Sequence, residues 1–199
     1  VFIGGARGQS GSIFCQTKNG FDLRNIPDFT QHKEHEDVAA VFFDADGDKD
    51  LDLVVVSGGP EQLSKPDPLR PRLYRNDGRG NLRFFEAAFP AVFLHASCVK
   101  PFDFDLDGDL DLFIGASVMP MLYGMSPMSY LFVNDGKGRF RPDQGWLGQS
   151  QFDNPTRLRP GMVKDAVWTD INKDRLPDLV LVGEWMPITV LVNQRGNLF

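Results

Sequence analysis

The 199-residue sequence has few cysteines, few histidines and no long apolar run. No stretch approaches the roughly 18 consecutive apolar residues expected of a membrane-spanning helix, so a transmembrane segment in this chain is disfavoured. Positive charge is also scarce, because 21 basic residues are set against 27 acidic ones and the formal net charge is -6. Clustered lysine and arginine dominate binding to nucleic-acid phosphates, so a nucleic-acid partner is disfavoured as well.

The few cysteines and histidines give weak support for catalysis. Cys15 and Cys98 are expected to be buried free thiols, with a disulfide between two repeats as the alternative. His32, His35 and His95 lack the spacing of a zinc site or a catalytic triad. Carboxylates outside the acidic segments described next form no obvious acid and base pair. We therefore expect that the protein is not an enzyme.

What the sequence has in abundance is acidic residues in three nine-residue ladders, where a carboxylate or carboxamide recurs mostly at alternate positions. The ladders run from Asp44 to Asp52, from Asp103 to Asp111 and from Asp170 to Asp178, and they hold 13 of the 27 acidic residues. Two carboxylates about 4 Å apart repel by roughly 4 kcal/mol at an effective dielectric constant near 20, so a tight loop of them needs a counter-ion. A solvated acidic turn is the alternative for any single ladder, but three copies in register favour metal binding.

Calcium is the expected ion. It accepts about six to eight oxygen ligands in flexible geometry, whereas magnesium requires an octahedron and keeps its water. Alternation would turn the side chains at ladder positions 1, 3, 5 and 9 toward one point, while the carbonyl at position 7 completes the shell. We therefore predict about three Ca²⁺ sites.

Apolar runs rich in β-branched residues flank the ladders and predict strands. They are 53–56, 112–114 and 179–182 after the ladders, and 38–43 and 163–168 before two of them. Such short continuous runs are typical of strands buried on both faces. An EF-hand is excluded, because it needs flanking helices and a glutamate at position 12, where the first ladder has Val55.

A hairpin signal follows each ladder. Asn-Asp-Gly-x-Gly lies within 73–82 and 131–140, and 191–198 is a looser copy. Asparagine and glycine accept the positive φ angles of tight turns. Each repeat is thus expected to supply four antiparallel strands, A to D, with the metal loop between A and B. The ladders start 59 and 67 residues apart, a period that predicts β-propeller blades.

These motifs resemble the FG-GAP or VCBS repeats of calcium-loop propellers, found in integrin α-subunit heads and in bacterial surface proteins related to cartilage acidic protein that often carry an ASPIC/UnbV segment. The resemblance rests on residues 1–6, 44–59, 103–116, 161–170 and 183–187. It implies side-chain ligands at positions 1, 3, 5 and 9 and a carbonyl ligand at position 7. The implied side-chain ligands are Asp44, Asp46, Asp48 and Asp52, then Asp103, Asp105, Asp107 and Asp111, then Asp170, Asn172, Asp174 and Asp178, and the carbonyls are those of Asp50, Asp109 and Leu176.

The repeats divide the chain into four units. Residues 1–37 are expected to form a blade without its first strand, 38–94 and 95–160 two whole blades, and 161–199 most of another. This predicts an all-β segment of a larger propeller, whose remaining blades would be its partner. An open arc is expected, and a closed four-bladed ring is the alternative.

Function is expected at the end opposite the metal loops. The long connections 60–72, 117–129 and 143–160 emerge there and carry methionines, Tyr123, Trp146 and Phe152, which suit recognition; loops that only cover the blade ends are the alternative. Trp168 and Trp185 are expected to pack between blades. We expect a calcium-stabilised adhesion module that binds a protein or a glycan outside the cytoplasm, secreted, at a cell surface or in a bacterial periplasm, where calcium is plentiful. The alternative is a blade set of a lyase-like or lectin-like carbohydrate-active protein, with Glu86 and Glu184 as the best-placed glutamate candidates, although a capping or ion-pairing role is expected for Glu184.

Overall fold

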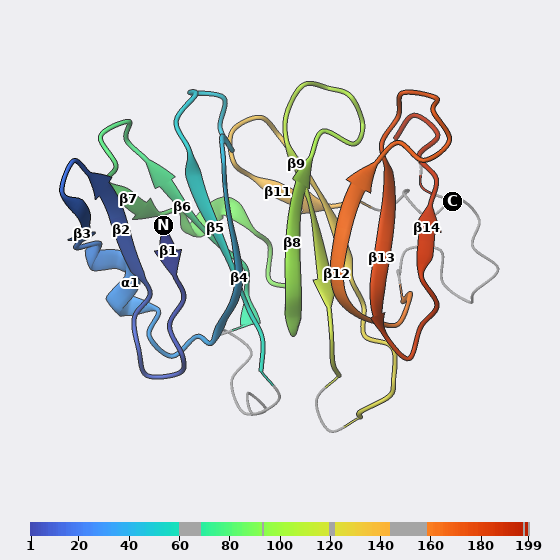
Figure 1. Ribbon diagram of the computed structural model, residues 1–199, viewed down its shortest axis with the longest axis horizontal. Coiled ribbons are helices and arrows are strands. Elements are labelled where there is room, and N and C mark those ends of the chain that lie inside the picture. The colour runs from blue at the N-terminus through green and yellow to red at the C-terminus, as the bar shows by residue number, and fades with distance from the viewer. Residues whose placement is uncertain (60–68, 93, 120–121, 144–158, 197, 199) are drawn as a thin grey trace.

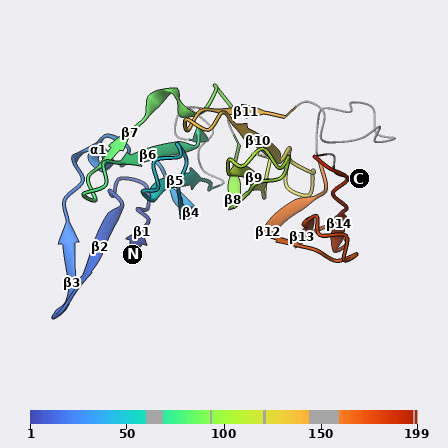
Figure 2. The same cartoon turned by 90° about the horizontal axis from the view of Figure 1, so that it is seen from above.

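The structure is a computed structural model that describes residues 1–59, 69–92, 94–119, 122–143, 159–196 and 198 (Figure 1). It is all-β, with four antiparallel sheets and almost no helix. Seen from above, the sheets stand side by side in an arc that the described part of the chain does not close into a ring (Figure 2). This confirms the predicted fold class and favours the open arc.

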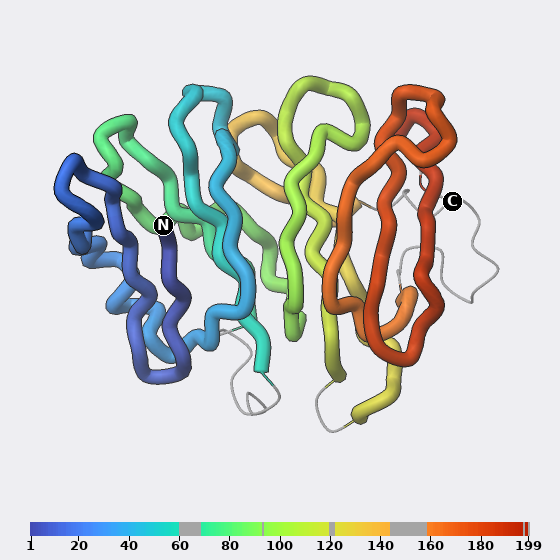
Figure 3. Tube along the Cα trace, viewed as in Figure 1, coloured from blue at the N-terminus to red at the C-terminus, as the bar shows by residue number. Residues whose placement is uncertain are grey.

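Each sheet follows the chain in simple up-and-down order (Figure 3). The first sheet contains β1 (Phe2–Ile3), β2 (Ser12–Thr17) and β3 (Gly20–Arg24), and the second contains β4 (Asp37–Phe43), β5 (Asp52–Ser57), β6 (Arg72–Asn76) and β7 (Leu82–Phe84). The third contains β8 (Ala96–Phe102), β9 (Asp111–Ala116), β10 (Tyr130–Asn134) and β11 (Phe140–Pro142), and the fourth contains β12 (Met162–Thr169), β13 (Asp178–Glu184) and β14 (Thr189–Leu191). The second and third sheets therefore have the four expected strands, while the two outer sheets have three each.

Apolar side chains pack between neighbouring sheets and form three clusters. Every residue of β5 and β9 is buried, as the continuous apolar runs predict. Strand β13 is only partly buried, because no described sheet covers its other face. Position in the arc, rather than the strand's own composition, therefore decides how much of it is buried.

The connections separate into two ends. The three acidic ladders lie at one end together with the β6–β7 and β10–β11 hairpins, while the β9–β10 and β13–β14 connections lie at the opposite end (Figure 1). This arrangement agrees with the antiparallel connectivity inferred from the sequence. The residues of the long connections at 60–68, 120–121 and 144–158, including Met121, Trp146 and Phe152, lie outside the described residues.

Some features differ from the expectations. The sequence did not predict helix α1 (Pro27–Gln31) or the short 3-10 helix η2 (Glu86–Ala88). Phe29 anchors α1, because its ring packs edge-on against the Tyr74 ring with the two ring centres 4.8 Å apart. Trp168 stacks on Phe102 between the third and fourth sheets, but the same expectation is wrong for Trp185, which is 76% exposed.

Two further observations concern the cysteines and the membrane. Cys15 and Cys98 are both free thiols, so the disulfide alternative is wrong. Cys98 is buried as expected, but Cys15 is only half-buried. Among the helices of the described residues, none combines the length and apolar character that crossing a membrane demands.

Two valines at equivalent strand positions test how packing between sheets stabilises the molecule. Val54 in β5 is fully buried against the third sheet, whereas Val180 in β13 lies on the open face of the fourth. We expect Val54→Ala to lower the free energy of unfolding by about 2 kcal/mol, since it leaves a cavity, and Val180→Ala to lower it by less than about 1 kcal/mol. Denaturant unfolding measures both, and equal losses would contradict this account of the core.

Candidate metal centres

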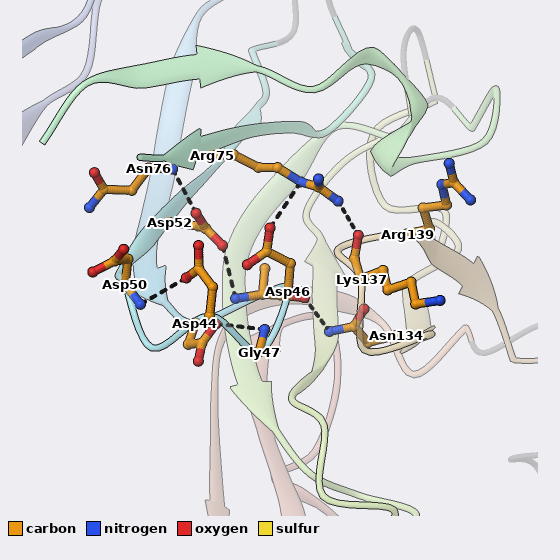
Figure 4. Close-up of polar contacts among 12 residues, drawn as sticks. Asp44, Asp46, Gly47, Asp50, Asp52, Arg75, Asn76, Asn134, Lys137 and Arg139 are labelled. Atoms are coloured by element: carbon orange, nitrogen blue, oxygen red, sulfur yellow. Dashed lines mark hydrogen bonds and ion pairs between the residues drawn. The ribbon is translucent and has the colours of Figure 1, made fainter. Parts of the chain in front are cut away.

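The first ladder joins β4 to β5 and folds back so that its acidic side chains converge. Asp44, Asp46 and Asp48 each place one carboxylate oxygen within 4.8 Å of the others. Figure 4 shows Asp44 and Asp46 in this loop beside the buried Asp52. Asp44 and Asp46 are half-buried, and Asp48 is exposed. This group brings together ladder positions 1, 3 and 5 as predicted from the sequence.

The second ladder, between β8 and β9, forms a related group. Here Asp103, Asp105 and Asp111 have carboxylate oxygens within 4.8 Å of one another. These are ladder positions 1, 3 and 9. Asp107, at position 5, is exposed, and its Oδ1 accepts a hydrogen bond from the Asp109 amide at 3.0 Å. Positions 1 and 3 thus belong to both groups, position 5 to the first group and position 9 to the second.

A shared backbone shape causes the convergence. Positions 4 and 6 have positive φ in all three ladders, at Gly47 (80°) and Lys49 (74°), Leu106 (65°) and Gly108 (98°), and Lys173 (65°) and Arg175 (72°). For a residue other than glycine this conformation costs roughly 1 kcal/mol or more, so something must hold it. The carboxylate at position 1 does so: Asp44 accepts from the amides of Gly47 (2.8 Å) and Lys49 (2.9 Å), and Asp170 accepts likewise from Lys173 and Arg175.

The aspartate at position 9 joins each loop to the third strand of its own sheet. Asp52 is fully buried; its Oδ2 accepts from the Ala45 amide at 3.0 Å and its Oδ1 from the Asn76 amide at 2.7 Å. Asp111 and Asp178 make the same pair of contacts in their sheets. The position-9 carboxylate is therefore a fixed structural group, although each oxygen still has a lone pair for a cation.

Burial makes these carboxylates costly to ionise. It raises the pKa of Asp52 to about 6 and that of Asp111 to about 7, against the lowering effect of two backbone amides in each case. Burial also raises the pKa of Asp46 and of Asp105, and the neighbouring Asp48 and Asp107 carboxylates raise these pKa values further. A bound cation would remove this penalty, because it favours the charged form.

Two oxygens indicate that a hard cation fits these loops. Oδ1 of Asp46 and Oδ1 of Asp103 are buried and accept no hydrogen bond. Buried polar atoms are normally satisfied, and an orphaned carboxylate oxygen inside an acidic loop suits an ion. The surrounding ligands are all oxygens, which is the ligand set of calcium or magnesium rather than zinc.

The position-7 side chains point out of the loops. The Asp50 and Asp109 carboxylates lie against Gly78 and Gly136, where a Cβ atom on either glycine would collide with them. Both glycines have positive φ and belong to the hairpin of the same sheet. This leaves only the carbonyls of Asp50, Asp109 and Leu176 as possible ligands at that position, which is the sequence expectation.

The third ladder is arranged differently. Asp170, Asn172 and Asp174 are all exposed, and Asn172 Nδ2 donates to Asp174 Oδ2 at 2.9 Å. Among the described residues, it forms no group of three converging acidic side chains like the other two. The fourth predicted ligand, Asp178, is buried at the start of β13. The predicted third site is thus the least enclosed of the three.

Two asparagines at or just after the end of third strands connect the first and second loops to the next sheet, and sequence reasoning did not identify them as site residues. Asn134 Nδ2 donates to a carbonyl of the first ladder, that of Ala45, at 2.9 Å (Figure 4). In the second ladder, Asn193 Nδ2 donates to the Phe104 carbonyl at 3.3 Å. The signal was present, because asparagine recurs at 76, 134 and 193 in the hairpin motif. The sequence motif alone does not reveal these contacts, because they form between neighbouring sheets.

Comparison with known families supports this reading of the repeats. The model of the FG-GAP-like repeat matches residues 44–114, which run from the first ladder through β9 and so include the second ladder. An FG-GAP-like repeat is therefore present in this part of the chain. A comparison with curated proteins gave no match.

The raised carboxylate pKa values predict a pH dependence in the presence of a chelator. Asp111 titrates near pH 7 when folded but near pH 3.9 when unfolded, so the folded state binds more protons and its stability falls as pH rises through this window. We expect the melting temperature in EDTA to be higher near pH 5.5 than near pH 7.5. The lowered pKa of His95 makes stability rise with pH and so acts in the opposite direction. The wild type is therefore compared with Asp111→Asn, in which the fall of melting temperature between these two pH values should be smaller. An identical decline in the variant would contradict the assignment to Asp111.

Proposed function

We propose that this chain is a calcium-stabilised, non-catalytic binding module of an extracellular or cell-surface protein. Its metal loops would stiffen the sheets at one end, and its recognition surface would lie at the opposite end. The observation that carries the binding role is a set of large exposed aromatic and apolar side chains, called the recognition patch below. They lie on two connections at the end opposite the ladders (Figure 1). Calcium is supported by the loop geometry and by its abundance outside the cytoplasm.

Calcium would be held by the ladder residues, with no catalytic part to play. The orphaned oxygens of Asp46 and Asp103 and the raised pKa of Asp111 support an ion in the first and second loops. When bound, calcium would neutralise the crowded carboxylates. The residues themselves shape the turn, as the amide contacts of Asp44 illustrate. Extracellular modules typically bind calcium with dissociation constants of about 0.1 to 1 mM.

The recognition patch is built from two adjacent connections. Its members are large side chains that are 46–76% exposed, namely Leu122, Tyr123, Met125, Trp185 and Ile188. The Tyr123 hydroxyl donates to Glu184 Oε2 at 3.0 Å and so joins the β9–β10 connection to the end of β13. Trp185 has φ 56°, an unfavourable conformation for a bulky residue. Exposed aromatic side chains of this kind are typical anchors for partners.

Glu184 supports a binding role better than a catalytic one. Its Oε2 accepts from Tyr123, and its Oε1 pairs with Lys164 Nζ at 3.4 Å. A carboxylate engaged at both oxygens holds neighbouring side chains in place. No second carboxylate pairs with it across the patch among the contacts of the described residues.

Further sheets of the same type are the proposed structural partners. The outer faces of the first and fourth sheets expose apolar side chains, and the equivalent positions of the inner sheets are mostly buried or half-buried. They include Ile3, Phe21 and Leu23 on the first sheet and Val167, Ile171, Val182 and Val190 on the fourth, all 40–65% exposed. Additional blades would cover these faces in the same way that the third sheet covers the second.

Calcium binding should raise thermal stability. At a concentration about a hundredfold above the dissociation constant, one site contributes about 2.7 kcal/mol, or about 5 to 10 °C in melting temperature for a chain of this size. We expect EDTA to remove this gain and Asp103→Ala to remove part of it. The exposed Asp22 lies outside the ladders, so Asp22→Ala is the matched control and should respond to calcium like the wild type. A melting temperature unaffected by both calcium and chelator would overturn the calcium proposal.

The binding surface is tested with a glycan array in millimolar calcium and, in parallel, with polysaccharide cleavage assays. We expect binding without cleavage, and Trp185→Ala should weaken it at least about tenfold, as loss of a central aromatic anchor does. Val38→Ala, another exposed apolar residue away from the patch, should leave binding unchanged. Cleavage that Glu184→Gln abolishes would show instead that the chain belongs to an enzyme.

A further inference from the structure

The first metal loop has a positively charged neighbour in the protein itself. Arg75, in β6, places Nε 3.5 Å from Asp46 Oδ2, and both side chains are largely buried, at 30% and 17% exposed. The guanidinium carbon lies 3.6 Å from the centre of the Phe85 ring, and Nη2 donates to the Lys137 carbonyl in the hairpin of the next sheet (Figure 4). These contacts hold the cation beside a predicted metal ligand.

The second loop has no such neighbour. The pairings of β6 with β5 and of β10 with β9 place Val133 at the position of Arg75, and Val133 is buried among apolar residues. Within the described part of the chain, no lysine or arginine forms an ion pair with Asp103, Asp105 or Asp111. Two loops with the same backbone shape therefore differ in whether a positively charged side chain pairs with one of their carboxylates.

This difference changes what each loop gains from a divalent ion. A fixed positive charge a few ångströms from a ligand oxygen repels an incoming cation and already offsets part of the carboxylate repulsion. The effect is appreciable because the Arg75–Asp46 pair is largely shielded from water, and salt and solvent screen a shielded pair only weakly. The first loop should therefore be more stable without calcium and gain less when calcium binds.

We propose that Arg75 acts as an internal cation that makes the two metal loops unequal, so that the second loop binds calcium at lower concentration than the first. The inference rests on the proposed function, since it assumes that the loops hold calcium. Two polar contacts join the first loop and its arginine to the third sheet. Arg75 donates to the Lys137 carbonyl, and Asn134 donates to the Ala45 carbonyl of the first loop. The weaker site would therefore be the one at the contact between the second and third sheets. Filling of the first loop would then respond to calcium over a higher range than filling of the second.

Isothermal titration calorimetry with calcium, supported by calcium-dependent melting curves, tests the proposal on the full chain. Asp174→Ala is introduced throughout to disable the third loop. Adding Asp105→Ala then reports on the first loop, and adding Asp46→Ala reports on the second. We expect calcium to bind the first loop at least about tenfold more weakly than the second, a ratio that corresponds to about 1.4 kcal/mol.

Substitution of Arg75 assigns the cause. In the first-loop protein, Arg75→Met keeps an unbranched side chain against Phe85 and should tighten calcium binding about tenfold, whereas Arg75→Lys keeps the charge and should leave binding weak. In the second-loop protein, Arg75→Met should change nothing. Arg75→Gln is the second neutral variant if the methionine protein does not fold.

The outcomes separate the two levels of the argument. Equal affinities of the two loops, or a first loop that is unchanged or weakened by both neutral variants, would overturn the role of Arg75 while leaving calcium binding intact. Failure of both loops to bind calcium in otherwise folded proteins would overturn the proposed function and this inference together.

Discussion

The crowding of carboxylates at the ends of buried strands is the constraint on which the rest of the structure depends. Strand pairing forces positions 1 and 9 of each ladder together, because they lie at the junctions with the two strands that pair. Asp52 and Asp111 are fully buried at these junctions, and this burial makes their carboxyl groups costly to ionise. Backbone amides meet part of that cost, but amides carry only partial charges. A full positive charge close to such an acidic loop end would lower this cost at neutral pH.

The loops and the packing of the sheets are one cooperative arrangement. Asn134 and Asn193 each use the backbone amide to hold the position-9 aspartate of their own sheet and the side-chain amide to hold the ladder of the sheet before. Within the described residues, the first and second ladders have a following sheet and contain converging carboxylates, whereas the third ladder has no following sheet and carries Asn172 in place of a carboxylate. The contacts of an acidic loop thus depend on the neighbouring sheet as well as on its own sequence.

Much of the fold and of the site could be predicted because the signals are local and repeated. Alternating acids, β-branched runs and Asn-Asp-Gly turns specify a strand, a loop and a hairpin within about 30 residues, which is the range where backbone preferences act. The contacts of Arg75 with Lys137 and of Asn134 with Ala45 span 62 and 89 residues, and no local pattern predicts them. Trp185 was misassigned for a similar reason, since an apolar side chain does not reveal whether its face of the molecule is covered.

Differences between equivalent positions are where a repeated scaffold acquires specific properties. The backbone of the three ladders is the same at positions 4 and 6, even where leucine, lysine or arginine must adopt the left-handed conformation. A shape maintained at that cost is a shared structural requirement, so it cannot distinguish one loop from another.

What distinguishes the loops is the surrounding side chains, such as Arg75 near the first ladder against Val133 near the second. At the opposite end, Trp185 and Tyr123 depart from the repeat in the same sense, because each occupies a connection whose length and composition differ from sheet to sheet. The rigid repeat therefore sets where charged and aromatic groups can lie, and the departures from it give each sheet its own set of these groups.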